Sequence, residues 1–380
     1  MKIYKINENT DFNIICKLIS PEKMGAIIMS KKARLHFFYI KGLSNTALNI
    51  LKQDALSLGA ELITHKEVIT HKAQNSPSLL IANENQLSKL IEKEKKQGFK
   101  LKDLAKFLQK SFKKPKVAKL MGVLNINNDS FNPSSRVSEA DFIQKLEAML
   151  ELKPDYIDLG AVSSRPGSSY VGSKEEQDRL KGIFKLISKH DYTKFAKFSL
   201  DSFDELSLKR ALDLGFKMIN DITGLKNENL AKLAKEYECE YCLMHMQNEP
   251  SNMQINPKYD DLLGEIEDFF AQKLEILKSY GVEKVVLDVG IGFGKSAEHN
   301  LILIKHLEHF LQFEKPLLVG ASRKSLINEY FKSEVQNRLA GTLFLHLKAF
   351  ENGASILRVH DLYEHKQILA LHEAMDKIFI

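Results

Sequence analysis

The sequence has no long apolar run and few cysteines, and both shortages restrict the class of protein. No stretch of about 18 consecutive apolar residues occurs, so we expect no membrane-spanning helix. Residues 1–10 alternate polar and apolar side chains instead of forming a signal-peptide core, so a cytoplasmic location is expected. Three cysteines, Cys16, Cys239 and Cys242, are too few and too odd in number for a disulfide framework, and reduced thiols are expected.

A strong charge of one sign is also missing. The 55 basic residues are interleaved with 49 acidic ones, the net charge is +6, and aromatic residues do not punctuate the basic runs. This balance disfavours nucleic-acid binding and is compatible with small anionic substrates. Apolar residues make up 44% of the 380 residues, which is typical of a globular protein of about two domains.

The second part of the chain, residues 117–380, alternates short apolar runs with longer amphipathic stretches. Eight runs have the composition of buried parallel strands: 117–126, 156–161, 197–202, 218–223, 241–246, 284–291, 316–322 and 356–361. Helical patterns lie between them, for example at 205–214, 229–237, 259–280 and 338–351. Eight strand–helix units of this total length predict a TIM (β/α)8 barrel in the α/β class.

The first part of the chain has a different pattern of apolar runs and helical stretches. Residues 1–112 contain apolar runs at 12–19, 34–40, 61–69 and 78–82, with helical patterns at 45–58, 85–97 and 101–112. They are interpreted as a small N-terminal α/β accessory domain, and residues 113–116, rich in lysine and containing a proline, as the linker to the barrel.

Polar residues gather where the predicted strands end. In TIM barrels the reacting groups come from the carboxyl ends of the strands. In chain order, the candidates are Asn125, Ser163, Ser164, Arg165, Asp201, Asn220, Asp221, His245, Asp288, Ser322, Arg323, Lys324, Arg358 and His360. Asp221 and His245 are equally well explained as satisfied core polar residues.

The basic groups after the last two strands predict an anion site. Ser322, Arg323 and Lys324 precede a helical pattern, and helix N-termini attract anions. Arg358 and His360 follow the eighth strand, and barrels often bind phosphate with the loops after strands seven and eight. We therefore expect a phosphorylated substrate there.

Two other motifs are rejected. The glycine-rich segment 290–296 has Val289 where a Walker A loop needs glycine. The pair Cys239 and Cys242 with His245 lacks the fourth converging ligand of a structural zinc site.

Eight segments in order, each at a predicted strand end, give the chain a resemblance to dihydropteroate synthase. They are 121–131, 157–167, 199–202, 219–222, 243–246, 287–295, 320–325 (Gly-Ala-Ser-Arg-Lys-Ser) and 357–361. The N-terminal part is similar to extensions found on some longer members of that family. The resemblance implies a transferase of folate biosynthesis, which condenses 6-hydroxymethyl-7,8-dihydropterin pyrophosphate with p-aminobenzoate to give 7,8-dihydropteroate and pyrophosphate.

The resemblance also implies roles for the rim residues. Pterin-binding residues would be Asp201, Asn220, Asp288, Lys324, Met244 and Phe293; pyrophosphate-binding residues Asn125, Ser322, Arg323, Arg358 and His360; and p-aminobenzoate-binding residues Ser164, Arg165 and Phe293. Lys324, Arg358, His360 and Asp201 would be catalytic. Asn125 would also contact Mg²⁺, the expected cofactor.

The expected partners are therefore two small molecules, with no nucleic acid and no membrane, and the family suggests a cytoplasmic homodimer that sulfonamides inhibit. The loop at 127–135 departs from the family, with Pro133 where an aspartate is usual. This departure leaves open a catalytically inactive barrel that senses pterins. A second alternative is a pterin-dependent methyltransferase, whose barrel also binds a pterin at the same rim.

Overall fold

The structure is a computed structural model that describes the chain except residues 9, 127–135, 163–167, 169 and 379–380. It divides into two compact units, one formed by residues 1–111 and 372–380 and the other by residues 112–371. The helices of the described residues include none long and apolar enough to cross a membrane.

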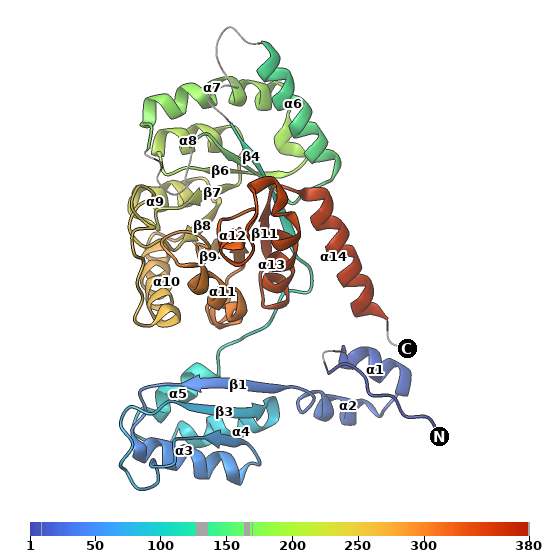
Figure 1. Cartoon of the computed structure of the whole chain (residues 1–380), viewed down its shortest axis with the longest axis vertical. Coiled ribbons are helices and arrows are strands. Elements are labelled where there is room, and N and C mark those ends of the chain that lie inside the picture. The colour runs from blue at the N-terminus through green and yellow to red at the C-terminus, as the bar shows by residue number, and fades with distance from the viewer. Residues whose placement is uncertain (9, 127–135, 163–167, 169, 379–380) are drawn as a thin grey trace. The chain divides into compact units, whose positions relative to one another are not determined.

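The first unit contains a three-stranded antiparallel sheet with the order β1-β3-β2. Its strands are β1 (Leu35–Ile40), β2 (Glu61–Ile63) and β3 (Ser78–Asn83), and its helices are α1 (Phe12–Ile19), α2 (Lys23–Ser30), α3 (Asn45–Ser57), α4 (Glu84–Glu94) and α5 (Leu101–Leu108). Helices α3 and α4 cover one face of the sheet (Figure 1), and Leu48, Leu51 and Leu80 are fully or almost fully buried in the core of this unit.

The apolar run at 12–19 forms a helix and not a strand. The side chain of Asp11 accepts a hydrogen bond from the backbone N–H of Asn13 at the start of α1, and Ser20 ends the helix in a left-handed conformation. Capping at both ends therefore outweighs the strand-like composition of this short run.

The second unit is a closed barrel of eight parallel strands in the part of the chain that the structure describes, in the order β10-β11-β4-β5-β6-β7-β8-β9. The strands are β4 (Lys119–Asn125), β5 (Tyr156–Gly160), β6 (Lys197–Asp201), β7 (Met218–Asp221), β8 (Glu240–Met244), β9 (Val285–Asp288), β10 (Leu317–Val319) and β11 (Ile356–Val359). Each lies within or next to its predicted run, and the predicted TIM barrel is confirmed.

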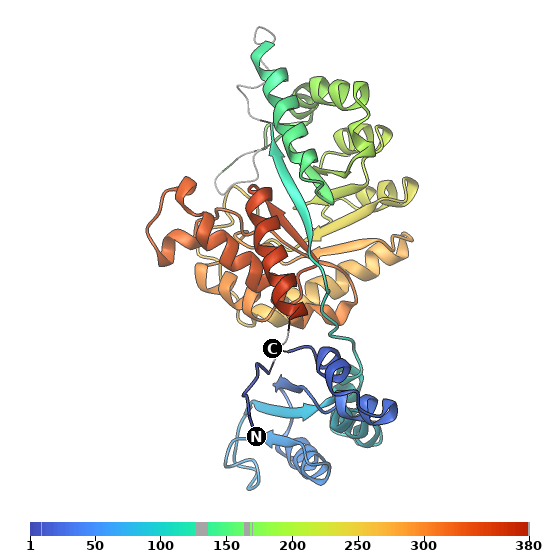
Figure 2. The ribbon, with the colours of Figure 1, turned by 90° about the vertical axis from the view of Figure 1, so that its right-hand side faces the viewer.

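Helices surround the barrel, as the two views in Figures 1 and 2 show. They are α6 (Arg136–Glu151), α7 (Ser173–Lys189), α8 (Glu205–Asp213), α9 (Asn229–Glu236), α10 (Leu262–Ser279), α11 (Ala297–Lys305), α12 (Leu326–Tyr330), α13 (Leu339–Glu351) and α14 (Leu362–Lys377), with short 3-10 helices η2 (Tyr192–Lys194), η3 (Leu307–Phe313) and η4 (Val335–Asn337).

Successive side chains of each barrel strand point to opposite faces of the sheet. The side chains on one face form a cluster that is separate from the core between the strands and the helices. This separate cluster is apolar: Met121, Tyr156, Met218, Cys242, Val286, Leu318 and Ile356. Since successive strand residues point to opposite faces, Asp158, Asn220, Asp288 and Arg358 follow two positions later with the same orientation. The barrel interior is therefore apolar at one level and polar at the next.

Candidate active site

One basic side chain lies between two buried carboxylates inside the barrel. Arg358 donates through Nε to Asp158 Oδ2 at 2.7 Å and through Nη2 to Asp201 Oδ2 at 2.8 Å. Asn220 donates to the same Asp158 oxygen at 3.1 Å. Asp158 is fully buried and Asp201 almost so, so these groups form a buried, charge-paired cluster from strands β5, β6, β7 and β11.

Burial disfavours the charged form of both Asp201 and Arg358, but the pKa of each group is set by a different balance. It raises the pKa of Asp201 to about 7, and the neighbouring Asp158 carboxylate adds to the rise, while Arg358 opposes it. Burial also opposes the charge on Arg358, but Asp158 and Asp201 outweigh it and hold the Arg358 pKa above its ordinary value. Arg358 therefore stays charged, and Asp201 titrates near neutral pH.

A second pair of opposite charges stands beside this cluster. Asp288 accepts a hydrogen bond from the Gly290 N–H at 2.7 Å, and burial raises its pKa. Lys324 donates to the Ile291 carbonyl and lies over the Phe293 ring, with Nζ 4.4 Å from the ring centroid. Burial lowers the Lys324 pKa to about 8, and the Asp288 carboxylate opposes that fall. The loop after β9 and the loop after β10 thus meet at Lys324.

The residues predicted to bind an anion after β10 and β11 differ in their hydrogen-bond partners. Ser322 Oγ lies 2.9 Å from His360 Nδ1 and accepts from the His360 backbone N–H at 3.3 Å. Arg323 instead binds the Asp361 carboxylate through Nε at 3.0 Å and Nη2 at 2.6 Å, and donates to the Val335 and Gln336 carbonyls. In this structure the Arg323 guanidinium therefore has four protein acceptors of its own.

Other predicted residues are also found at the barrel mouth. Asn125 is exposed at the end of β4, and a Cβ at Gly160 would come within 3.0 Å of its Oδ1. Met244 is buried and pairs in register with Asp288. Ser164, Arg165 and the loop at 127–135 lie outside the described residues.

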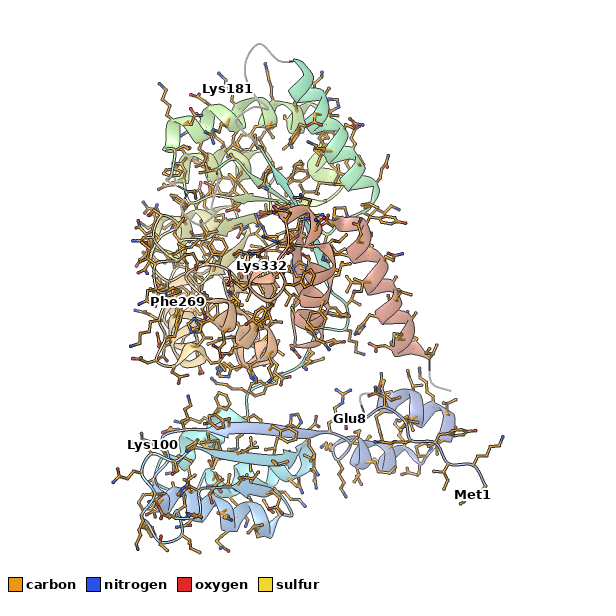
Figure 3. The ribbon with its side chains drawn as sticks, in the orientation of Figure 1. Met1, Glu8, Lys100, Lys181, Phe269 and Lys332 are labelled. Atoms are coloured by element: carbon orange, nitrogen blue, oxygen red, sulfur yellow. The ribbon has the colours of Figure 1, made fainter. Side chains whose placement is uncertain are left out.

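Lys295, in the glycine-rich segment 290–296, is buried beside His245 at the end of β8. Its Nζ lies 3.0 Å from His245 Nδ1 and donates to the carbonyls of His245 at 3.2 Å and Phe293 at 2.9 Å. The His245 ring also packs edge-on against Phe269 of α10, with centroids 5.0 Å apart; Phe269 is labelled in Figure 3. Lys295 thus joins the loops after β8 and β9.

Asp221 is a satisfied core residue. Its carboxylate accepts from the Thr223 and Leu225 backbone N–H groups and from the Tyr241 hydroxyl. Its buried partners explain its presence at a strand end.

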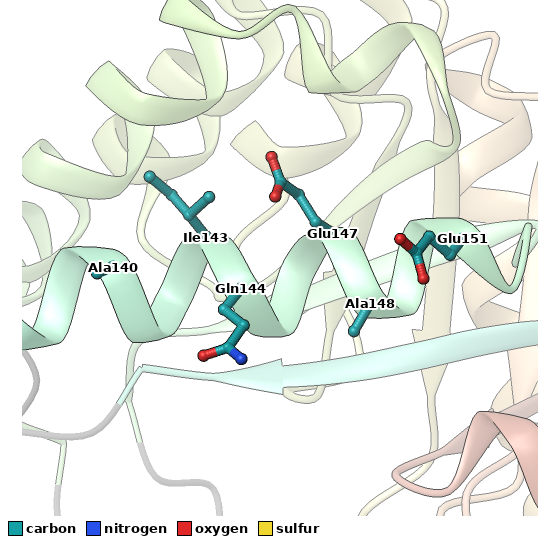
Figure 4. A pocket seen from close by; sticks show the side chains of 6 residues that line it. All are labelled: Ala140, Ile143, Gln144, Glu147, Ala148 and Glu151. Atoms are coloured by element: carbon teal, nitrogen blue, oxygen red, sulfur yellow. The ribbon is translucent and has the colours of Figure 1, made fainter.

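Two other features lie apart from this chemistry. A hollow of about 430 Å³ runs along α6 (Figure 4), and all its lining residues, from Ala140 to Glu151, belong to that one helix. Cys239 and Cys242 are buried, and burial raises the pKa of Cys239 to about 12. Among the described residues, no group of three or more histidine, cysteine or acidic side chains could hold a metal ion.

The mouth of the barrel therefore combines carboxylates at one level with basic and hydroxyl groups at the strand ends. A model of the family described as "Pterin binding enzyme" matches residues 121–360, the part that supplies these groups. Dihydropteroate synthase of Haemophilus influenzae is 34% identical over 262 residues, which cover 68% of this chain and 94% of that protein. The chain belongs to the dihydropteroate synthase family.

The family assignment extends to structure and to the first unit. The crystal structure of Yersinia pestis dihydropteroate synthase with a sulfonamide drug complex is similar, with a TM-score of 0.63 and 33% identity, over 70% of this chain and 96% of that one. The Clostridium difficile synthase in the presence of pteroic acid gives 0.63 and 34%, over 70% and 100%. The bifunctional dihydropteroate synthase/dihydropteroate reductase of Helicobacter pylori is 41% identical over 99% of this chain and 100% of its own length.

These relatives confirm the expected transferase of folate biosynthesis among the three functions considered. The residue that sequence reasoning missed is Asp158, which lies in a motif of the resemblance but was not named as a site residue. Its signal is an aspartate inside an apolar strand, two positions after Tyr156 and so on the same face.

Proposed function

We propose that the barrel mouth binds dihydropterin pyrophosphate and p-aminobenzoate side by side and joins them with release of pyrophosphate. The observation that carries this proposal is the buried Asp158: its Oδ1 has no hydrogen-bond partner among the described residues, although Oδ2 has two. A fully buried carboxylate oxygen without a partner is unfavourable, and an N–H of a pterin edge would satisfy it.

The pterin end matches the polar level of the barrel interior. A pterin presents N–H donors and ring acceptors along one edge. Asp158, Asp201 and Asp288 are acceptors for the N–H groups, while Asn220 and Lys324 donate to ring acceptors. Met244 and Phe293 supply apolar contact to the ring, and Lys324 already lies over the Phe293 ring.

The pyrophosphate end matches Arg358, Ser322 and His360. Arg358 binds Oδ2 of Asp158 and Oδ2 of Asp201 in this structure, and pterin N–H groups would bind the same two carboxylates. We propose that the guanidinium then turns towards the strand ends and pairs with pyrophosphate. One arginine thus balances the carboxylates before binding and the leaving group afterwards.

The reaction joins these two ends at the pterin methylene. The C–O bond to pyrophosphate breaks, the aromatic amine of p-aminobenzoate forms the new C–N bond, and the amine loses a proton. Within the barrel, Lys324 and Arg358 stabilise charge and position the substrates. Ser164 and Arg165 remain the proposed p-aminobenzoate contacts, together with Phe293.

Magnesium fits the donor chemistry at the end of β4. Mg²⁺ prefers oxygen ligands and is commonly held by one or two protein groups, substrate phosphates and water. Asn125 offers an exposed amide oxygen there, beside Gly160. We propose that Asn125 helps to hold Mg²⁺, which when bound would neutralise charge on the pyrophosphate.

The test mixes the purified chain with dihydropterin pyrophosphate, p-aminobenzoate and Mg²⁺. Dihydropteroate and pyrophosphate should appear in equal amounts, and omission of either organic substrate should abolish both products. Absence of dihydropteroate under all conditions would refute the proposal.

We also propose a second activity, the reduction of dihydropteroate. Its support is the Helicobacter pylori relative, which is named as both a synthase and a reductase and matches 99% of this chain, the first unit included. Reduction adds two electrons and two protons to the product of the first reaction. The full-length chain should convert dihydropteroate to the tetrahydro form when NADH, NADPH or reduced flavin is supplied. Failure with all three donors would exclude this activity without affecting the synthase proposal.

Three further properties are proposed from the family. We propose that the chain is a cytoplasmic homodimer and that sulfonamides compete with p-aminobenzoate in its site. Light scattering of the purified protein measures the mass against the 43.3 kDa of one chain. A sulfonamide should raise the KM for p-aminobenzoate and leave that for dihydropterin pyrophosphate unchanged.

A further inference from the structure

Two buried histidines lie behind the anion end of the site. His346 on α13 and His365 on α14 are both fully buried, and their ring centroids are 4.9 Å apart. His346 Nε2 accepts from the Ala321 backbone N–H at 2.9 Å, His346 Nδ1 lies 2.7 Å from His365 Nε2, and His365 Nδ1 lies 2.6 Å from the Asp361 carbonyl oxygen. These contacts form a continuous chain from Ala321 to Asp361.

This series of hydrogen bonds determines which nitrogen of each histidine ring carries the proton. A backbone N–H can only donate, so His346 Nε2 carries no proton and His346 Nδ1 does. That proton is donated to His365 Nε2, so His365 also carries its proton on Nδ1 and donates it to the Asp361 carbonyl. Both rings are therefore neutral, and each is required in one tautomer.

A second set of bonds completes the connection. The Arg323 N–H donates to Thr342 Oγ1 at 2.8 Å, one helical turn before His346 on α13. The Arg323 guanidinium binds the Asp361 carboxylate. Arg323 has a φ of +55°, a left-handed conformation that is unfavourable for a side chain of this size. Bonds on both sides of it hold this conformation in place.

Two of the proposed pyrophosphate ligands, Ser322 and His360, are sequence neighbours of the residues that these hydrogen bonds connect. Ser322 lies between Ala321 and Arg323, and His360 immediately precedes Asp361. We propose that His346 and His365 are positioning residues, which tie the loops after β10 and β11 together so that Ser322 and His360 meet the pyrophosphate in a fixed geometry. This inference rests on the proposed function of that site.

The first test compares steady-state kinetics of His346→Leu, His346→Gln and wild type. Leucine removes the acceptor for Ala321, whereas the glutamine amide can both accept and donate. We expect His346→Leu to raise the KM for dihydropterin pyrophosphate by about tenfold, the effect of about 1.4 kcal/mol, with little change for p-aminobenzoate. Glutamine should restore part of the affinity, and His190→Leu, at an exposed position, should have no effect. Equal changes for both substrates, or none, would overturn the proposal.

The second test does not depend on catalytic activity. Nuclear magnetic resonance of the wild-type chain with ¹⁵N-labelled histidine reports the tautomer of each ring, and His346→Gln and His365→Gln assign the signals. We expect two neutral rings protonated at Nδ1. A proton on Nε2 of His346 would exclude this series of hydrogen bonds, even if the barrel makes dihydropteroate. Two rings protonated at Nδ1 would support the series, even if the barrel makes no dihydropteroate.

Discussion

Asp158 is the residue on which the pterin interpretation depends most. The change Asp158→Asn keeps the shape but removes the charge opposite Arg358. We expect the KM for dihydropterin pyrophosphate to rise by about 10- to 100-fold, as for loss of a buried charged hydrogen bond. Initial-rate measurements over a range of that substrate check this. Asp178→Asn, at an exposed position on α7, is the matched control, and equal behaviour of the two variants would contradict the role of Asp158.

The pKa values of Asp201 and Lys324 predict a narrow pH optimum. Burial raises the Asp201 pKa to about 7 and lowers the Lys324 pKa to about 8. The binding of a pterin N–H needs an ionised Asp201, so kcat/KM should rise with pH through about 7. It should fall above about 8 as Lys324 loses its proton, which gives a bell-shaped profile.

The variant Lys324→Arg tests the alkaline limb of that profile. Arginine keeps its proton throughout this range, so the fall above pH 8 should disappear even if the maximum rate is lower. A fall that persists unchanged in this variant would assign the limb to another group.

At the scale of elements, strand positions were predictable because a buried parallel strand is a short apolar run. The same apolar runs also predicted which polar residues stand at the carboxyl ends of the strands. Contacts between distant segments were not predictable: nothing in the sequence near Arg323 shows that Asp361 binds it, or that Lys295 is buried against His245. Such partners depend on the register of strands that are far apart in the chain.

The loop after β9 offers a direct test of close packing. A Cβ at Gly290 would lie 1.9 Å from the His245 carbonyl oxygen, and Gly290 has a φ of +68°. We expect Gly290→Ala to destabilise the protein by at least about 1–2 kcal/mol, the cost of a left-handed conformation alone. Gly98→Ala is the control, because a Cβ there meets nothing within 4 Å. Thermal unfolding of both variants measures the difference, and equal midpoints would show that the loop can move freely.

Helices α13 and α14 carry a pH dependence of stability. His346 is buried near His365, Lys324 and His360, and burial, followed by electrostatic interaction with these groups, lowers its pKa well below the ordinary value. Burial also lowers the His365 pKa, against the opposing effect of Asp361 and Glu364. The unfolded chain therefore binds more protons below about pH 6.5, so the free energy of unfolding decreases as the pH is lowered through that range.

Each histidine accounts for a slope of up to about 1.4 kcal/mol per pH unit in that range. In His346→Gln the slope should be smaller by up to that amount, which urea unfolding at several pH values measures. An unchanged slope would mean that His346 binds its proton as readily in the folded protein as in the unfolded chain.

At the scale of the whole molecule, the described residues of the proposed synthase site all belong to the second unit. The Haemophilus influenzae synthase matches this part of the chain over 94% of its own length. We expect a chain that begins at Lys114 to keep synthase activity and to lose the proposed reduction of dihydropteroate. Parallel assays of both reactions check this, and loss of synthase activity in a folded barrel would show that the first unit contributes to it.

The most direct measurement of the central claim is the rate of dihydropteroate formation by Lys324→Ala and Lys332→Ala. Lys324 donates to the Ile291 carbonyl and lies over the Phe293 ring, whereas Lys332 is exposed; Figure 3 labels Lys332. Lys324→Ala removes a preorganised positive charge from the site, so its rate should be lower than that of wild type by about 10²-fold or more. Lys332→Ala should match wild type. A near-normal rate for Lys324→Ala would contradict the assignment of the barrel mouth as the site of synthesis.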